Sequence, residues 1–460
     1  MTILIRGGSI VSESATSEGD VLCDGERVAQ VGKSLSAPKG ARVIDARGKF
    51  VFPGFIDPHV HIHLPFMGTL AKDTYESASR AALLGGTTTL IEMVCPSRRD
   101  DPLEAFDLWM SKAVGRSACD FTFHMGVTRF DDTTEAALSE IVRRGVTSFK
   151  VFLAYKGAFG VDDAELYKTL ALAKRLGVVV TAHCENETLV SERCRELLAR
   201  GRTDPGAHHE SRPPEVEAEG VNHLMTFAEL TGAEVYIVHL SCAEALERAL
   251  AARARGVKVS IETLIQYLIL DKTHAERPGL EGAKFVMSPP LRDKRNQRVL
   301  WDALKRGDID TVATDHAPFD VATQKRMGEA DFTKIPNGIP SLEDRVSLLY
   351  TRGVEGGLLG VHDLVRVASA NAARRFGLYP RKGVIAVGSD ADIVVFDPAH
   401  RGTISAATHS MAVDYNAFEG SPVIGRAETV LVRGEVAVDE GRFVGTIGRG
   451  QFLARQGATP

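Results

Sequence analysis

Residues 147–183 read TSFKVFLAYKGAFGVDDAELYKTLALAKRLGVVVTAH. The stretch begins and ends with a short β-branched run, at 147–153 and 177–183, and residues 162–176 between them have a helical pattern. A strand, a helix and a second strand in this order are typical of a β/α unit in a parallel sheet. The stretch therefore predicts an α/β fold.

The same alternation extends from about residue 53 to residue 380. Eight runs have the character of strands: KFVFPGFID (49–57), TTTLIEMV (87–94), FTFHMG (121–126), TSFKVFL (147–153), GVVVTAH (177–183), AEVYIVHL (233–240), VKVSIE (257–262) and DTVATD (310–315). Helical stretches lie between them, for example at 134–144, 162–176, 243–255 and 294–306. Eight parallel β/α units over this length predict a closed (β/α)8 TIM-like barrel.

The two ends of the chain have a different pattern. Short alternating segments separated by glycine, such as ILIRGGSIV near the start and TVLVRGEVAVDEGRFVG near the end, predict β-hairpins. Neither piece can bury a core alone. We therefore expect residues 1–52 and 385–460 to pair into one small β-sandwich domain, beside a barrel domain of residues 53–384.

The composition is that of an ordinary globular protein, with 44% hydrophobic and 25% charged residues. The formal net charge is −5, so no basic excess exists and we expect no nucleic-acid binding. No apolar run is long enough to span a membrane, and we expect no membrane partner. The six cysteines are scattered without a C-x-x-C pair, which favours reduced thiols and a cytoplasmic location.

The expected strand ends carry many potential metal ligands, and barrel enzymes hold their sites at these ends. The candidates are His59, His61, Lys150, His183, His239 and Asp315. His59 and His61 are two residues apart on an extended chain, so their side chains point to the same side. We expect Asp57 to be structural and His316 to help orient Asp315.

Each candidate also has an ordinary explanation. His183 and His239 could be hydrogen-bonded core histidines, and Asp315 could cap a helix. Lys150 could extend its ammonium out of the strand end; alternatively, burial could depress its pKa, and the neutral amine could add carbon dioxide to give a carbamate that bridges two cations. Together, the six groups favour two divalent cations about 3.5–4 Å apart. Zinc is the first candidate, and manganese, cobalt and nickel stay open.

Longer motifs follow one another in a specific order along the chain. They include PGFIDPHVH, SFKVFLAY, AHCEN, VHLS, KFVMSPPLRD, ATDHAPF and IPNGIPSLEDR. This order resembles that of the cyclic amidohydrolases of the amidohydrolase superfamily, most closely dihydropyrimidinases and D-hydantoinases, over essentially the whole chain. The resemblance implies hydrolysis of dihydropyrimidines or 5-substituted hydantoins, which are small cyclic ureides, to N-carbamoyl amino acids.

The resemblance also implies roles for single residues. His59, His61 and Asp315 would bind the first metal, His183 and His239 the second, and carboxylated Lys150 would bridge both. Asp315 would act as general base and then general acid, and Tyr155 would donate to the developing oxyanion. Ser288 and Asn337 would hold the imide ring through their backbone groups. The wall for the ring substituent would consist of Leu64, Phe66, Phe152 and Phe159.

Three alternatives stay open at this point. The ring could be that of allantoin or dihydroorotate. Dihydroorotases resemble the pattern H-x-H-x-R at the first strand, and this chain has His63 at the position of the arginine, which argues against dihydroorotate. The chain could also be a non-catalytic scaffold like the dihydropyrimidinase-related proteins, but those have lost metal ligands and all six are present here. We interpret His63 as a loop residue with an open role. The resemblance further implies a homotetramer, or a homodimer.

Overall fold

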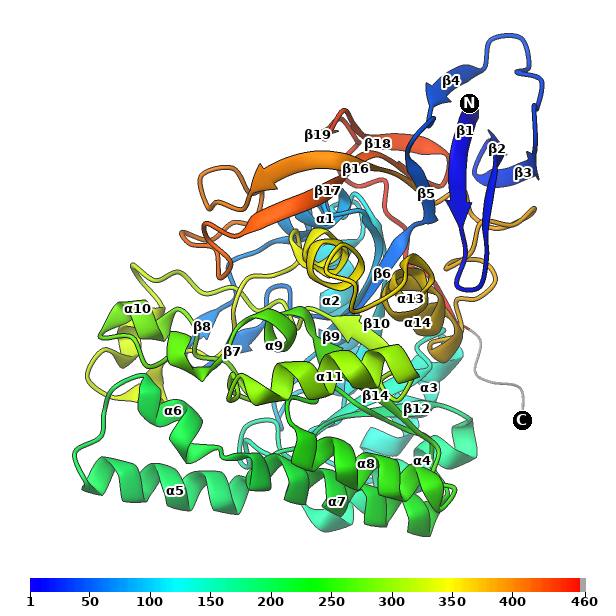
Figure 1. The fold of residues 1–460 in the computed structure, drawn as a ribbon. Coiled ribbons are helices and arrows are strands. Elements are labelled where there is room, and N and C mark those ends of the chain that lie inside the picture. The colour runs from blue at the N-terminus through cyan, green and yellow to red at the C-terminus, as the bar shows by residue number, and fades with distance from the viewer. Residues whose placement is uncertain (456–460) are drawn as a thin grey trace.

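Eight parallel strands form a barrel at the centre of the molecule (Figure 1). The computed structural model describes residues 1–455. The barrel strands are, in order, β6 (Phe55–Val60), β9 (Thr87–Val94), β10 (Asp120–Gly126), β11 (Ser148–Phe152), β12 (Val179–His183), β13 (Val235–Ile237), β14 (Val259–Leu264) and β15 (Thr311–Ala313). A parallel bridge between Val60 and His316 joins the last strand to the first, and the predicted barrel is confirmed.

Helices follow the strands and cover the outside of the barrel. The longer ones are α1 (Tyr75–Leu84), α2 (Pro102–Ala113), α3 (Asp132–Arg143), α4 (Asp163–Leu176), α5 (Glu187–Ala199), α7 (Pro214–Thr231), α8 (Ala243–Ala254) and α11 (Arg295–Arg306). Four of them, α3, α4, α8 and α11, lie within two residues of the predicted stretches. Local signals set the ends of α4: Asp162 and Glu165 form a capping box at its start, and Gly177 ends it with a left-handed φ of 65°.

Shorter helices lie in the connections. They are α6 (Gly206–Ser211), α9 (Ile265–Ile269), α10 (Leu280–Ala283), α12 (Arg345–Leu348), α13 (Val361–Val365), α14 (Asn371–Arg375), the 3₁₀ turns η1 (Lys272–His274), η2 (Lys325–Gly328) and η3 (Phe332–Lys334), and the π-helical η4 (Leu349–Val354) and η5 (Arg366–Ala370). None of the helices within residues 1–455 is both long and apolar enough to cross a membrane.

The two ends of the chain share a nine-stranded sheet that packs beside the barrel (Figure 1). Its strands are β1 (Thr2–Val11), β2 (Thr16–Asp24), β3 (Arg27–Gly32), β4 (Arg42–Asp45), β5 (Phe50–Pro53), β16 (Ile393–Thr403), β17 (Pro422–Val432), β18 (Glu435–Asp439) and β19 (Arg442–Phe443). Antiparallel pairing of β5 with β16 joins the two ends. Ile5, Val21, Ile393 and Leu431 from both ends share one buried core, so the expected pairing is confirmed.

The sequence predicted one strand over residues 49–57, but the structure divides this run into two strands. Phe50–Pro53 belongs to the flanking sheet, whereas Phe55–Val60 belongs to the barrel. Gly54 separates them, and a Cβ atom there would collide with the Thr88 side chain, so only glycine fits the passage between the two sheets. The exact domain boundaries, at residues 52 and 385, stay a prediction.

Two hydrophobic cores stabilise the barrel. The larger lies between strands and helices, and the smaller fills the barrel interior with buried side chains such as Ile56, Met93, Tyr236 and Phe376. These buried side chains pack the barrel interior.

Two short strands, β7 (Pro65–Phe66) and β8 (Thr69–Leu70), form a hairpin just after β6. It lies over the end of the barrel where the carboxyl ends of the strands meet.

Candidate functional site

The carboxyl ends of the barrel strands surround one cavity. All thirteen residues that the sequence analysis assigned to the site line it: His59, His61, Leu64, Phe66, Lys150, Phe152, Tyr155, Phe159, His183, His239, Ser288, Asp315 and Asn337. The remaining lining residues are Cys95, Ala317 and Gly338. The structure thus brings together residues that are up to 278 positions apart in the sequence (59 to 337).

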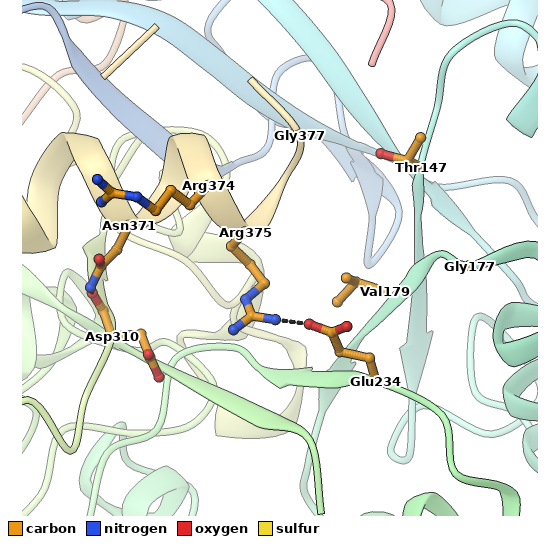
Figure 2. Close-up of a pocket in the computed structure, with 9 residues that line it drawn as sticks. All are labelled: Thr147, Gly177, Val179, Glu234, Asp310, Asn371, Arg374, Arg375 and Gly377. Atoms are coloured by element: carbon orange, nitrogen blue, oxygen red, sulfur yellow. Dashed lines mark hydrogen bonds and ion pairs between the residues drawn. The ribbon is translucent and has the colours of Figure 1, made fainter. Parts of the chain in front are cut away.

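A larger cavity of about 370 Å³ lies at the opposite ends of the strands (Figure 2). Arg375 of α14 forms an ion pair there with Glu234, which precedes β13 (Figure 2). Asp310 in the same cavity pairs with Arg253, and Arg374 pairs with Glu13. Because these charges compensate one another, this cavity has none of the unpaired ligand groups that mark the first one.

His59, His61 and Asp315 form a compact group of three ligand atoms. Asp315 Oδ1 lies 3.1 Å from Nε2 of His59 and 3.1 Å from Nε2 of His61. Burial raises the pKa of Asp315, but the charges and hydrogen bonds of the two histidines outweigh it, and the net shift is well below the usual range. Asp315 is therefore a carboxylate. All three atoms lie within 4.8 Å of one another, which suits one divalent cation.

His183 and His239 form a second group beside the first. Nδ1 of His183 lies 2.9 Å from Nε2 of His239, so the two nitrogens face the same point in the cavity. The far nitrogen of His183, Nε2, is 2.9 Å from a carboxylate oxygen of Glu185. This arrangement orients the imidazole as in other metal sites, in which a carboxylate holds the nitrogen that does not bind the metal.

Lys150 lines the same cavity as the two groups, and its side chain is fully buried. Its Nζ has no hydrogen-bond partner among the residues described, although a buried amine without a partner is costly. Burial lowers the pKa of Lys150 to about 8. An unpartnered amine with a depressed pKa, in the same cavity as two sets of candidate ligands, fits a lysine that could be carboxylated. The donor set as a whole fits two divalent metal ions.

Tyr155, Ser288 and Asn337 also line the cavity. Asn337 Nδ2 donates to Ser288 Oγ at 3.0 Å, and both side chains contribute to lowering the pKa of the nearby Tyr155 phenol. Burial raises the pKa of Tyr155 to about 12, so the phenol keeps its proton at neutral pH.

Aromatic rings form part of the cavity wall beside the candidate ligands, and the Phe152 ring lies 6.0 Å from that of His183. The Phe66 ring lies 5.5 Å from the ring of Tyr155 and 6.1 Å from that of Phe159, and Phe159 lies 5.7 Å from Phe152. Leu64 lines the cavity with these rings. All four residues predicted to contact a ring substituent therefore line the cavity: Leu64, Phe66, Phe152 and Phe159.

The backbone is strained where functional groups enter the cavity. Tyr155, His239 and Asp315 have φ values of 63°, 42° and 47°, in a region that residues other than glycine rarely adopt. Such strain is typical of residues whose direction is fixed by the surrounding structure for a function.

The sequence of the chain matches the model of the Amidohydrolase family over residues 50–437. The chain belongs to the amidohydrolase family. A solved D-hydantoinase (dihydropyrimidinase) from a Thermus species is 59% identical, with a TM-score of 0.98 and 99% of both chains covered. A D-hydantoinase from Geobacillus stearothermophilus is 47% identical over 99% of this chain and 97% of the relative. A dihydropyrimidinase from Dictyostelium discoideum is 40% identical over 99% of this chain and 91% of the relative. The resemblance to dihydropyrimidinases and D-hydantoinases is confirmed, and the chain is an enzyme.

Glu262, the last residue of the predicted run 257–262, was not among the site residues predicted for this amidohydrolase. Its carboxylate lies 2.7 Å from His59 Nδ1 and accepts from the His239 backbone N–H at 3.0 Å. Glu262 thereby fixes the His59 ring so that Nε2 faces the cavity. An acidic residue at the end of the predicted run was the only signal in the sequence, and β14 continues to Leu264.

The neighbours of the ligands differ partly from expectation. Asp57 accepts from Thr314 Oγ1 at 2.6 Å and from the His59 backbone N–H at 3.2 Å, as a structural residue would. The expectation that the His316 side chain orients Asp315 is wrong, because its Nε2 lies 2.8 Å from an Asp73 carboxylate oxygen. His63 lies outside the metal cavity and lines an open depression beside the β7–β8 hairpin.

Proposed function

We propose that the enzyme hydrolyses the ring amide bond of dihydropyrimidines and of 5-substituted hydantoins, giving N-carbamoyl amino acids. The observation that carries this proposal is the cavity, because six potential ligands of two metal ions face a polar pair, Ser288 and Asn337, and an aromatic wall. The names of the relatives, D-hydantoinase and dihydropyrimidinase, support the same class of substrate. A cyclic ureide has donors and acceptors on adjacent ring atoms and a substituent that needs an apolar surface.

Two divalent cations, with zinc as the first candidate, complete this proposal. The first would be held by His59, His61 and Asp315, and the second by His183 and His239, with carboxylated Lys150 between them. When bound, such a pair lowers the pKa of water and polarises a carbonyl group. The lowered pKa of Lys150 supports the carbamate, because the neutral amine that must add to carbon dioxide is accessible near neutral pH.

Asp315 would move the proton in this reaction. Its carboxylate can accept a proton from the attacking water and give it to the ring nitrogen as the amide bond breaks. The lowered pKa keeps the group ionised at neutral pH, which is the protonation state that a proton acceptor needs. The strained backbone, with φ of 47°, supports a fixed direction for the side chain.

Tyr155 would stabilise the tetrahedral intermediate. As the carbonyl carbon becomes tetrahedral, its oxygen gains negative charge, and a neutral phenol can donate a hydrogen bond to it. The raised pKa of Tyr155, about 12, keeps the required proton in place. Backbone groups of Ser288 and Asn337 would hold the rest of the ring, and Leu64, Phe66, Phe152 and Phe159 would contact its substituent.

Initial rates on dihydrouracil and 5-phenylhydantoin, measured side by side with zinc-loaded enzyme, test this proposal. We expect at least one ring to open, with its N-carbamoyl product. Two bound metals without turnover of either ring would refute the ring assignment, and allantoin would be the next substrate. The cytoplasmic location and the homotetramer stay predictions.

A further inference from the structure

Lys325 is a second fully buried lysine close to the cavity, and neither the sequence motifs nor the proposed mechanism uses it. It is the first residue of η2, and its side chain has no solvent exposure. Its Nζ donates to three backbone carbonyls: Val286 at 2.9 Å, Pro336 at 2.7 Å and Gly338 at 2.7 Å. No carboxylate of residues 1–455 lies within 4.0 Å of this nitrogen.

The three contacts define the charge of the group. Burial lowers the pKa of Lys325. However, three carbonyl oxygens at hydrogen-bond distance need three N–H donors, which the ammonium has and the neutral amine lacks. The Phe319 ring, whose centroid lies 6.0 Å from Nζ, adds a face that favours a cation. The geometry therefore supports a buried ammonium that is stabilised by carbonyl dipoles.

The positions of these carbonyls connect Lys325 with the cavity. Val286 precedes Ser288 by two residues, and Pro336 and Gly338 stand on either side of Asn337. The two segments also touch directly, because the Gly338 N–H donates to the Val286 carbonyl at 3.0 Å. The ammonium thus holds together the two chain segments that present Ser288 and Asn337 to the cavity.

The peptide bond between Pro336 and Asn337 connects the Lys325 ammonium with a donor at the cavity. Lys325 binds its carbonyl oxygen, while the Asn337 N–H at its other end has no acceptor among the described residues. A cation on the oxygen of a peptide polarises it and makes its N–H a stronger donor. An N–H without a protein acceptor, at a residue that lines the cavity, is available to a ligand there.

We infer that Lys325 is a positioning residue for the cyclic ureide: its ammonium fixes the spacing of the Ser288 and Asn337 segments and strengthens the Asn337 N–H as a donor to the ring. The inference rests on the proposed function of this cavity. It concerns substrate binding, and it predicts no effect of Lys325 on metal binding, because none of its three contacts is a metal ligand.

The test compares Lys325→Met with Lys382→Met in the metal-loaded enzyme. Lys382 is a matched control because it is equally buried and also has three oxygen partners, from Asp120, Asp392 and Asp390 at 2.6, 2.7 and 3.0 Å. Those partners lie between the barrel and the flanking sheet, away from the cavity. Each variant is examined for its metal content, its KM and kcat with dihydrouracil, and its amide hydrogen exchange at residues 286–289 and 336–339.

In Lys325→Met we expect KM to rise about tenfold or more, kcat to change less than about threefold, and two metals to stay bound. Exchange in the two segments should become at least about tenfold faster, whereas Lys382→Met should change neither KM nor exchange there. An unchanged KM in folded Lys325→Met, or an equal rise in Lys382→Met, overturns the inference.

Two further outcomes keep the inference separable from the proposed function. If the wild-type enzyme opens no cyclic ureide, the proposed function fails, and hydrogen exchange alone decides on Lys325: equal exchange in both variants refutes its role in spacing the segments. If Lys325→Met does not fold, Lys325→Gln replaces it, because the glutamine amide can donate two hydrogen bonds. A KM above that of the wild type then supports the inference, and a wild-type KM overturns it.

Discussion

Replacing Glu262 by glutamine tests how strongly the surroundings of the ligands control metal binding. Glu262 accepts hydrogen bonds from His59 Nδ1 at 2.7 Å, from the Tyr236 hydroxyl at 2.8 Å and from the His239 backbone N–H at 3.0 Å. The amide oxygen of glutamine can accept from His59 and His239, and Tyr236 can turn its hydroxyl toward Thr311 Oγ1 at 2.5 Å. The substitution therefore removes the negative charge and leaves most of the hydrogen bonds.

The expected loss follows from that difference. A carboxylate makes the imidazole that it holds a better ligand, and changes to such groups cost about 10–100-fold in metal affinity. This corresponds to about 1.4–2.7 kcal/mol of binding free energy. Competition with a chromophoric chelator measures the zinc affinity of Glu262→Gln against the wild type. Asp120→Asn is the control, because Asp120 is also buried but pairs with Lys382, far from the cavity. An unchanged affinity in Glu262→Gln, or the same loss in Asp120→Asn, would refute the reasoning.

Three further predictions concern other residues of the molecule. Lys150→Ala should bind neither metal and lose turnover, because the bridging group is gone; two bound metals with full activity would contradict the carbamate. Tyr155→Phe should lower kcat by about 10²–10³-fold, equivalent to about 2.7–4 kcal/mol, with little change in metal content, and an unchanged kcat would exclude the phenol as the oxyanion donor. Burial raises the pKa of Glu92 from 4.5 to about 8, so the folded protein keeps a proton that the unfolded chain releases above pH 4.5. This stabilisation is complete below that pH and is lost as pH rises through 8, with a slope of up to about 1.4 kcal/mol per pH unit. Glu92→Gln mimics the protonated acid, so urea unfolding between about pH 5 and pH 8 should show a smaller loss of stability than in the wild type; parallel curves would refute the assignment.

The barrel could be predicted because its strands carry local signals. Val179–His183, for example, is a short β-branched run that follows a capped helix and a glycine, and its strand bounds agree with the expected run within two residues. The grouping of the candidate ligands in one cavity could be predicted because barrel topology places every strand end on the same face. His59 and Asp315 are therefore expected to be neighbours although 256 residues separate them (59 to 315).

What the sequence could not show are contacts that depend on three-dimensional register. Glu262 lies 203 residues from His59, and nothing in VKVSIE indicates that its last side chain turns toward the first strand. Likewise, Lys325 stands in a polar segment, ATQKRMG (322–328), that has the pattern of an exposed turn, yet it is fully buried. The division of residues 49–57 at Gly54 could not be predicted for the same reason. The Thr88 side chain, which is distant in the sequence, leaves no space for a Cβ atom at position 54.

We expect two divalent cations at this site to be necessary for the opening of a cyclic ureide ring. The most direct measurement adds zinc in steps to metal-free enzyme and follows bound metal and the rate of dihydrouracil or 5-phenylhydantoin opening in the same samples. We predict that the rate reaches its maximum at two bound zinc ions per chain. Full activity of the metal-free enzyme, or no ring opening with two ions bound, would contradict the claim.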